Sequence, residues 1–294
     1  MLAAWAKFAT DHPNLVSSEV VGQTVQGRNI ILYKIGNPGA GRVMLSGSTH
    51  GFEKAAVEIL LMFADWVIHS NDAEAVRIRE RNYLLCLPIL DIDGYPSLSG
   101  MNYNSVNLYR NFDFRWGQEL ASHTKNPDWT VWTQYCGPNA ESEPETRALK
   151  TAWLKWLPRN YCDVHVGGSG YNIWYSWLAD TVDKNHMIET GKKYLARSPV
   201  NPFNWAENAG SSGCPVSASY HNSGKRIWGY VIEVCIQNPV YETIASTHYP
   251  NFKEVAITLC QDVESAPSPP PYIPLWTWPL LTWLRNLLAG SEIS

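Results

Sequence analysis

Hydrophobic and polar residues follow two different periods along this chain. Runs that are apolar throughout or that alternate with period two are typical of strands, and apolar positions three and four apart are typical of helices. Strands are predicted at residues 16–21, 29–36, 43–45, 82–90, 161–166, 171–177 and 227–236, and helices at 6–11, 57–68, 143–157, 181–197 and 251–263. Strands that alternate with helices predict an α/β fold, with a mixed, mostly parallel sheet and helices on both faces.

Two regions between these elements lack a clear period. Residues 97–139 are rich in Asn, Gly, Tyr and Trp, and a loop of this length inside a compact domain is usually functional. Residues 201–224 are also predicted to be mostly loop. Between them, Ser142 and Glu145 form a capping-box pattern that predicts Ser142 as the residue that begins the helix before Pro158.

The composition changes near residue 265. Residues 266–271 are Pro-rich and predict a stiff spacer, and residues 272–288 form an apolar tail with three tryptophans. Prolines break the tail, which is too short for a confident membrane span. We therefore divide the chain into a domain at 1–264 and a tail at 265–294, and expect the tail to contact the domain, a partner or a membrane surface.

The overall composition limits the classes of function. With 45% hydrophobic and 17% charged residues, the 294-residue chain is long enough to bury a large core. A net charge of −4 and the absence of a basic run argue against nucleic acid as a partner. No secretory signal precedes the domain in this numbering, so the protein is either intracellular or lacks its leader here, and its location stays open. Cys136 and Cys214 lie in loop-like sequence and could pair.

Candidate metal ligands occur where the strand at 43–45 gives way to a helix. His50 and Glu53 are about one helical turn apart, so both side chains can point to the same place. An imidazole nitrogen and a carboxylate oxygen both suit zinc, and catalytic zinc sites usually use three protein ligands. Taken alone, the pair is also compatible with a glutamate that simply begins a helix beside a loop histidine, without a metal.

Further candidates lie at the ends of two other predicted strands. Asp163 and His165 are two residues apart and so share one face of a strand. Glu233 is the one charge in a strongly apolar strand, where an unpaired carboxylate is costly unless it does chemistry. Sites in such sheets form at the carboxyl ends of strands, which favours a shared site. His50, Glu53 and His165 would bind zinc, and Glu233, or next Asp163, would act as the general base.

Several segments together resemble the zinc metallocarboxypeptidase family of carboxypeptidase A/B type, over about residues 1–264. They are GQTVQGRNI at 22–30, GSTHGFE at 47–53, ILDIDGYP at 89–96, NLYRNFDF at 107–114, GPNAESEPET at 137–146, DVHVGG at 163–168 and GYVIEV at 229–234. The resemblance implies a mixed eight-stranded sheet between helices, one zinc ion per chain, and hydrolysis of a peptide's last amide bond.

The resemblance also implies roles for individual residues. It assigns His50, Glu53 and His165 as zinc ligands, and Glu233 as general base. Arg110 corresponds to the arginine that binds the substrate's terminal carboxylate, so we count it as a catalytic and substrate-binding residue. Tyr109 and Asn111 flank it and are candidate substrate contacts, although the family usually has an asparagine at position 109. The family's substrate-capping tyrosine aligns near Ala209, and Tyr220 or Tyr171 is a candidate replacement.

Two further departures from the family concern the chemistry. Asn107 stands where an aspartate usually orients the first histidine, and its amide oxygen can accept the same hydrogen bond without the negative charge. Gly100 stands where an arginine usually polarises the scissile carbonyl. Arg115 and Arg226 are the charged candidates to replace that arginine, and Asn102 and Asn104 could donate a neutral hydrogen bond. The alternative is that zinc alone stabilises the oxyanion and the enzyme is slow.

Three functions are compatible with these patterns. The first is a zinc peptidase that cleaves a peptide, from its C-terminus in the family's usual way. The second is a related zinc amidase or endopeptidase that acts on a non-standard amide such as a cell-wall peptide, because the carboxylate clamp is incomplete. The third is a non-catalytic binding module, which Glu233 argues against, since such a module needs no buried base.

Overall fold

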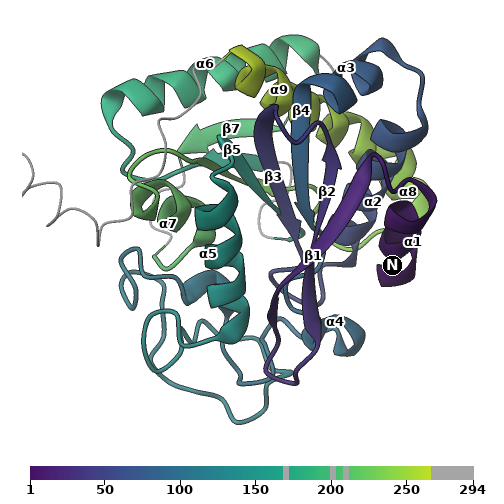
Figure 1. Cartoon of the computed structure of the whole chain (residues 1–294). Helices are drawn as coiled ribbons and strands as arrows, with labels where there is room; N and C mark the ends of the chain where they lie inside the picture. Colours follow the sequence, from purple (N-terminus) through teal and green to yellow (C-terminus); the bar gives the residue numbers. More distant parts are fainter. Residues whose placement is uncertain (168–171, 199–202, 208–211, 266–294) are drawn as a thin grey trace, which may run out of the picture.

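A computed structural model describes residues 1–167, 172–198, 203–207 and 212–265. In these ranges the chain forms a mixed eight-stranded sheet with helices on both faces, as the patterns and the resemblance predicted (Figure 1). The predicted spacer and all but the first residue of the tail lie outside the described residues, as do the candidate Tyr171 and the position of Ala209. No described helix is long and apolar enough to cross a membrane.

The elements follow one another in the predicted alternation. The strands are β1 (Val16–Gln23), β2 (Asn29–Gly36), β3 (Gly41–Gly47), β4 (Asn82–Leu87), β5 (Asn160–His165), β6 (Asn172–Tyr175), β7 (Asn204–Glu207) and β8 (Trp228–Glu233). The helices are α1 (Leu2–Asp11), α2 (Lys54–His69), α3 (Ala73–Arg81), α4 (Gly94–Ser97), η1 (Leu108–Arg110), α5 (Pro144–Trp156), α6 (Thr181–Arg197), α7 (Pro215–Asn222), α8 (Tyr241–Thr243), the π-helical η2 (Ile244–His248) and α9 (Tyr249–Ser265).

The strand order is β1-β2-β4-β3-β5-β8-β6-β7. The central strands β4, β3, β5 and β8 are parallel, β1 and β2 extend one side antiparallel, and β6 is antiparallel to β8. Parallel strands end at the same edge of a sheet, so the residues after β3, β5 and β8 meet there. Functional residues predicted at the ends of these strands are thereby brought together.

Side chains on the central strands alternate between two buried layers. Leu45 and Cys86 belong to the core shared with α1, α2 and α9, whereas Met44 and Leu85 belong to the core shared with α5 and α7. Figure 1 shows α5 and α7 on one face of the sheet and α2, α6 and α9 on the other. Because both faces are buried, the central strands are continuous apolar runs rather than alternating ones.

The predicted capping box at Ser142 is wrong. The N-cap of α5 is Glu143, one residue later, and Pro144 occupies the first turn. The Ser142 hydroxyl accepts a hydrogen bond from Asn111 and donates one to Glu143, while the Glu145 carboxylate accepts from the backbone N–H of Val25. The bonds of Ser142 with Asn111 and of Glu145 with Val25 join α5 to other segments and replace the local cap that the pattern predicted.

Two other details differ from the predictions. The region at 201–224, predicted as loop, contains β7 and α7 within its described residues. No disulfide joins Cys136 and Cys214; all six cysteines are buried thiols. β7 pairs with β6 and α7 packs against β8, and a local pattern does not contain these contacts.

Candidate active site

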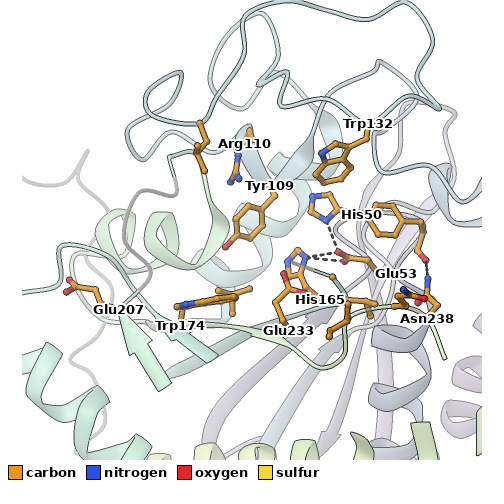
Figure 2. Close-up of a pocket in the computed structure, with 17 residues that line it drawn as sticks. His50, Glu53, Tyr109, Arg110, Trp132, His165, Trp174, Glu207, Glu233 and Asn238 are labelled. Atoms are coloured by element: carbon orange, nitrogen blue, oxygen red, sulfur yellow. Dashed lines mark hydrogen bonds and ion pairs between the residues drawn. The ribbon is translucent and has the colours of Figure 1, made fainter. Parts of the chain in front are cut away.

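Three potential metal ligands converge at the predicted edge of the sheet. His50 lies in the loop after β3, Glu53 immediately precedes α2, and His165 ends β5. Their ligand atoms all lie within 4.8 Å of one another, and all three side chains are buried (Figure 2). Ser48 adopts a left-handed conformation with φ of 51°, which lets the chain turn sharply between β3 and His50.

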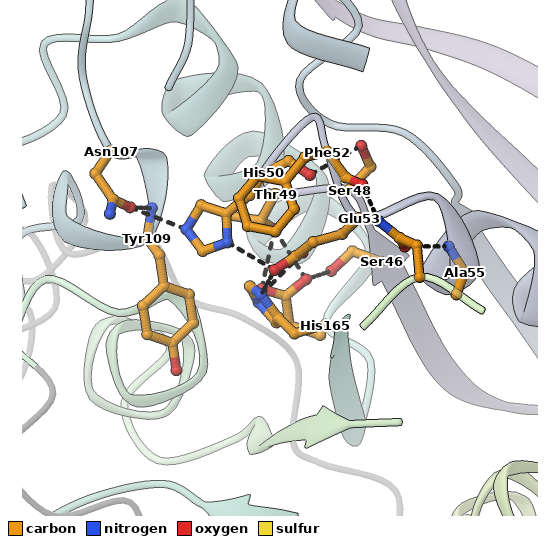
Figure 3. Close-up of polar contacts among 12 residues, drawn as sticks. Ser46, Ser48, Thr49, His50, Phe52, Glu53, Ala55, Asn107, Tyr109 and His165 are labelled. Carbon is orange, nitrogen blue, oxygen red and sulfur yellow. Dashed lines mark hydrogen bonds and ion pairs between the residues drawn. The ribbon is translucent and has the colours of Figure 1, made fainter. Parts of the chain in front are cut away.

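Both histidines present Nδ1 to Glu53. His50 Nδ1 lies 2.9 Å from Glu53 Oε1, and His165 Nδ1 lies 3.1 Å from both carboxylate oxygens. Each Nε2 instead donates a hydrogen bond away from the cluster, His50 to Asn107 Oδ1 at 3.0 Å and His165 to Asp163 Oδ2 at 2.7 Å (Figure 3). These bonds fix the tautomer that leaves both Nδ1 lone pairs for a metal. Two imidazoles and a carboxylate are a donor set that fits zinc.

The hydrogen bond from His50 to Asn107 confirms that an amide replaces the usual carboxylate there. Asn107 Oδ1 also accepts from the backbone N–H of Tyr109 at 3.0 Å, and its Nδ2 donates to the carbonyl of Thr133 at 3.2 Å. The amide therefore has fixed partners on both ends. Its oxygen must face His50, which determines the orientation of the ring.

Asp163 orients His165, a role that the sequence analysis missed. Its carboxylate is fully buried and accepts hydrogen bonds from the hydroxyls of Ser46, at 2.5 Å, and Thr49, at 3.0 Å. Because these donors and His165 occupy both oxygens behind the metal cluster, Asp163 does not face the cavity and is not the alternative base. The two-residue spacing between Asp163 and His165 was the sequence signal that could have identified this orienting role.

The pKa values of Glu53 and His165 reflect mutual stabilisation of their charges. Burial alone would raise the pKa of Glu53, but His165 and His50 outweigh it and lower the value to about 2. Burial would lower the pKa of His165, and the carboxylates of Glu53 and Asp163 instead raise it well above the usual value. A proton thus occupies the cluster readily when no metal is bound, and a metal must displace it.

Glu233 ends β8 directly opposite His165, its register partner on β5. Its Oε2 is buried and has no hydrogen-bond partner among the described residues. Burial raises the pKa of Glu233 to about 7, helped by the charges of Glu53 and Asp163 and opposed by that of His165. A carboxylate with a pKa near neutrality, beside a metal cluster and facing a cavity, suits a general base.

A cavity of ≈ 920 Å³ opens above the cluster and Glu233. Figure 2 shows Tyr109 and Trp132 above it and Trp174 below, with Glu207 at the far end from the cluster. The long loop predicted to be functional supplies several of the lining residues, namely Tyr109, Arg110, Leu120 and Trp132. A volume of this size accommodates one or two residues of a peptide.

Arg110 is the one lysine or arginine that lines the cavity in the described part of the chain. Its Nε donates to Gln134 Oε1 at 2.8 Å, while its Nη1 is buried without a hydrogen-bond partner there. The guanidinium lies 5.1 Å from the centre of the Tyr109 ring. An incompletely satisfied buried cation at a cavity wall is suited to bind an anion.

Asn111 and Tyr220, predicted as substrate contacts, do not line the cavity. Asn111 Nδ2 donates to the carbonyls of Cys136 and Asn139 and to Ser142, and its Oδ1 accepts from the N–H of Glu143, so it holds the loop together. The Tyr220 hydroxyl donates to Asp183 and accepts from the N–H of Asp180, inside the core. Both predictions are corrected because these polar groups are committed to structural partners.

Neither candidate for the missing arginine lines the cavity. Arg115 pairs with Glu119 and lies over the ring of Trp177. Arg226 precedes β8 at the opposite end from Glu233 and is also absent from the cavity wall. A side chain at Gly100 would collide with Trp132 and Phe52, which fill that space. The idea that either arginine acts there is therefore wrong.

Trp132 and Phe52 form an aromatic wall that the sequence patterns did not indicate. The Trp132 ring meets His50 edge-on at 4.8 Å between ring centres, and meets Phe52 at 5.7 Å. Trp132 belongs to a loop without periodicity, 82 positions after His50, so no local pattern could place it. The wall leaves one side of the metal cluster apolar.

Comparison with known proteins agrees with this geometry. A sequence profile described as zinc carboxypeptidase matches residues 1–236. Human carboxypeptidase B is 31% identical over 172 residues, which cover 50% of this chain and 39% of that protein. The matching segment therefore spans less than half the length of that relative.

Solved structures with the same fold include peptidases and an amidase. The carboxypeptidase A of Helicoverpa armigera superposes with a TM-score of 0.72 at 17% identity, covering 89% of this chain and 72% of that one. The murein-tripeptide amidase MpaA of Escherichia coli O157 superposes with a TM-score of 0.55 at 18% identity, covering 86% and 94%. At these identities the likeness concerns the fold alone.

Proposed function

The chain belongs to the zinc carboxypeptidase family, and from this premise we propose that it hydrolyses the C-terminal amide bond of a peptide, with Glu233 as general base. The observation that supports this most directly concerns Nη1 of Arg110, at the wall of the cavity that also contains Glu233. This atom is buried and has no hydrogen-bond partner among the residues that the structure describes. A guanidinium in this position suits a substrate's terminal carboxylate. That contact selects the last residue of a peptide.

Each residue then has a defined task. His50, Glu53 and His165 would hold a zinc ion, which would supply acidification of a water and polarisation of the scissile carbonyl. Glu233 takes the proton from the attacking water and returns it to the leaving amine. Arg110 fixes the substrate's carboxylate, so that the bond to be cleaved lies beside Glu233. The buried setting of Glu233 raises its pKa to about 7, which favours both directions of proton transfer near neutral pH.

A second candidate is a zinc amidase for a non-standard amide such as a cell-wall peptide. It is favoured by Tyr109 and Gly100, which replace two of the polar groups that the carboxypeptidase resemblance implies, and by the fold shared with a murein-tripeptide amidase. Trp132 and Phe52 fill the space beside Gly100, where the resemblance implies an arginine. This aromatic wall would pack against a bulky or apolar group of the substrate.

A substrate panel separates the two. The zinc-loaded protein is incubated with short peptides that carry either a free or an amidated C-terminus, and with a murein tripeptide linked to its sugar. Release of the C-terminal residue from the free peptides alone supports the carboxypeptidase. Equal cleavage of both peptide sets, or cleavage of the murein substrate alone, would reject it in favour of the amidase.

A further inference from the structure

Under the proposed function, a peptide has a fixed direction in the cavity. Its terminal carboxylate lies at Arg110 and its scissile carbonyl lies beside Glu233, and both residues line the same cavity. The scissile carbonyl belongs to the penultimate residue of the peptide, whose side chain is attached to the neighbouring carbon atom. The penultimate side chain therefore lies close to the metal cluster, and the rest of the peptide continues away from Arg110.

A series of ring contacts shows what the cavity presents on that side. The Arg110 guanidinium lies 5.1 Å from the centre of the Tyr109 ring, whose centre lies 6.0 Å from that of His50. The His50 ring in turn meets Trp132 at 4.8 Å, and Trp132 meets Phe52 at 5.7 Å. Figure 2 shows Arg110 and Tyr109 to the left of His50, and Trp132 above it. The aromatic wall thus follows the first histidine ligand in the direction that leads away from Arg110.

The loop that carries Trp132 is fixed on both sides of this residue. The Ser99 hydroxyl donates to the carbonyl of Trp129 at 2.6 Å, and Asn107 Nδ2 donates to the carbonyl of Thr133 at 3.2 Å. The position of the Trp132 ring beside the metal cluster is thereby set before a substrate binds, so little free energy is needed to order it on binding.

Trp132 also offers accessible surface to a substrate. The residue lines the cavity and is 46% exposed. Its ring packs on Gly100, since a Cβ atom at that position would lie 2.3 Å from Trp132 Cε3 and 2.8 Å from Phe52 Cε1. The absence of a side chain at Gly100 therefore makes room for the two rings of the aromatic wall.

We propose that Trp132 is a specificity-determining residue, which together with Phe52 binds the penultimate side chain and selects peptides that carry a large apolar residue there. This inference rests on the proposed function, because the carboxylate contact with Arg110 sets the direction of the peptide. The preference arises from apolar surface that leaves water and from contact between the substrate and the indole ring. An aromatic penultimate residue should benefit most.

Kinetics on a set of peptides tests this. The peptides share one C-terminal residue and carry Phe, Leu or Gly at the penultimate position. For the zinc-loaded wild type we expect kcat/KM to be about 10- to 100-fold higher with Phe than with Gly. In Trp132→Ala this ratio should fall to about threefold or less, because the penultimate side chain then stays largely in water. A ratio taken within one variant is unaffected by a general loss of zinc or of folded protein.

Three further variants separate a contact with substrate from a structural effect. Gly100→Ala keeps the indole but displaces it, so it should lower the Phe to Gly ratio as Trp132→Ala does. Trp132→Phe retains an aromatic ring and should keep most of the preference. Trp129→Ala is the matched control on the same loop, since Trp129 packs on Tyr103 and does not line the cavity, and it should show the wild-type ratio.

A binding measurement gives an answer that needs no turnover. Calorimetry on the zinc-loaded proteins compares two phosphonate analogues of a C-terminal dipeptide, with Phe or Gly at the penultimate position. The wild type should bind the Phe analogue more tightly, by about the factor seen in kcat/KM, and Trp132→Ala should bind both about equally.

The outcomes distinguish this inference from the proposed function. If the wild type cleaves the peptides without a preference for Phe, or if Trp132→Ala keeps the preference, the inference is overturned and the carboxypeptidase activity stands. If the wild type cleaves no peptide with a free C-terminus, the proposed function fails, and the phosphonate pair decides the inference. Equal wild-type affinities for the two phosphonates would then reject Trp132 as the selecting residue.

Discussion

His165 Nε2 donates a 2.7 Å hydrogen bond to the carboxylate of Asp163, two residues earlier on the same strand. The corresponding partner of His50 is an amide, Asn107. One histidine ligand thus has a charged orienting group and the other has a neutral one. The two are expected to differ in how much they contribute to zinc affinity.

Replacing Asp163 by Asn should weaken zinc binding about 10- to 100-fold. The Ser46 and Thr49 hydroxyls would hold the amide oxygen, so the amide N–H₂ would face His165 Nε2 and favour the tautomer with its proton on Nδ1. Competition with a chromophoric chelator measures the affinity. Asn107→Asp is the matched variant and should tighten binding. Wild-type affinity in Asp163→Asn would contradict the orienting role.

Removal of a ligand should abolish the metal site. The purified protein is expected to contain about one zinc per chain, and His165→Ala should contain almost none, because two ligands remain of three. Metal analysis after dialysis gives the result directly. His123→Ala, a change at an exposed loop histidine, should retain the zinc. Full zinc occupancy in His165→Ala would show that His165 is not a zinc ligand.

Glu233→Gln should keep the zinc and the fold but lose about a hundred- to ten-thousandfold in kcat, since an amide cannot accept the proton. Circular dichroism and metal analysis serve as the controls for folding and zinc content. Wild-type turnover would place the base elsewhere.

The pH dependence of catalysis should report the same carboxylate. The base form of Glu233 is the ionised one, so kcat/KM should fall as pH drops through its pKa. Burial raises that pKa to about 7 without metal, and a bound dication lowers it by favouring the anion, which places the acid limb below pH 7. The residual activity of Glu233→Gln should lack this limb. If Glu233→Gln shows the same acid limb as the wild type, the limb reports the ionisation of another group.

Arg110→Gln should mainly affect substrates with a free C-terminus. The amide retains some hydrogen bonding but loses the charge, so kcat/KM for free peptides should fall at least about tenfold while that for amidated peptides changes little. Steady-state kinetics on matched peptide pairs measures this. Equal losses on both members of a pair would show that Arg110 does not recognise the carboxylate.

Glu145 predicts a pH dependence of stability. Burial raises its pKa to about 7, above the usual 4.5, so the folded protein favours the protonated form. The unfavourable effect is absent below pH 4.5 and grows to at most about 3 kcal/mol above pH 7. Glu145→Gln should therefore gain stability relative to wild type as pH rises from 5 to 8, measured by urea unfolding. The exposed Glu80→Gln should show no such trend, and a parallel course of Glu145→Gln with wild type would contradict the effect.

The parts of the site that sequence predicted are those fixed by strand ends. His50, His165 and Glu233 each follow from a recognisable strand, and the parallel register brings the ends of those strands together. Arg110 was identified through a short motif rather than a period. For these residues local sequence contains most of the information, because backbone geometry determines the direction of the side chain.

The errors concern polar side chains whose partners are distant in sequence. Asn111 looked like a substrate contact because it adjoins Arg110, but it bonds to loop atoms 25 or more positions away. Tyr220 was predicted as loop and lies on a helix that turns it into the core. Trp132 was overlooked because its loop has no period. Tertiary hydrogen bonds and packing decide such cases, and neither leaves a local pattern.

The pairing of His165 with Glu233 across β5 and β8 also limits which insertions the protein can tolerate in these strands. Successive side chains on a strand point to opposite faces, so inserting one codon between Asn160 and Val164 would turn His165 away from Glu53 or shift it out of step with Glu233. Insertions in the exposed part of the loop at 118–131 face no such restriction. Length variation among homologues should therefore concentrate in that loop and be absent from β5.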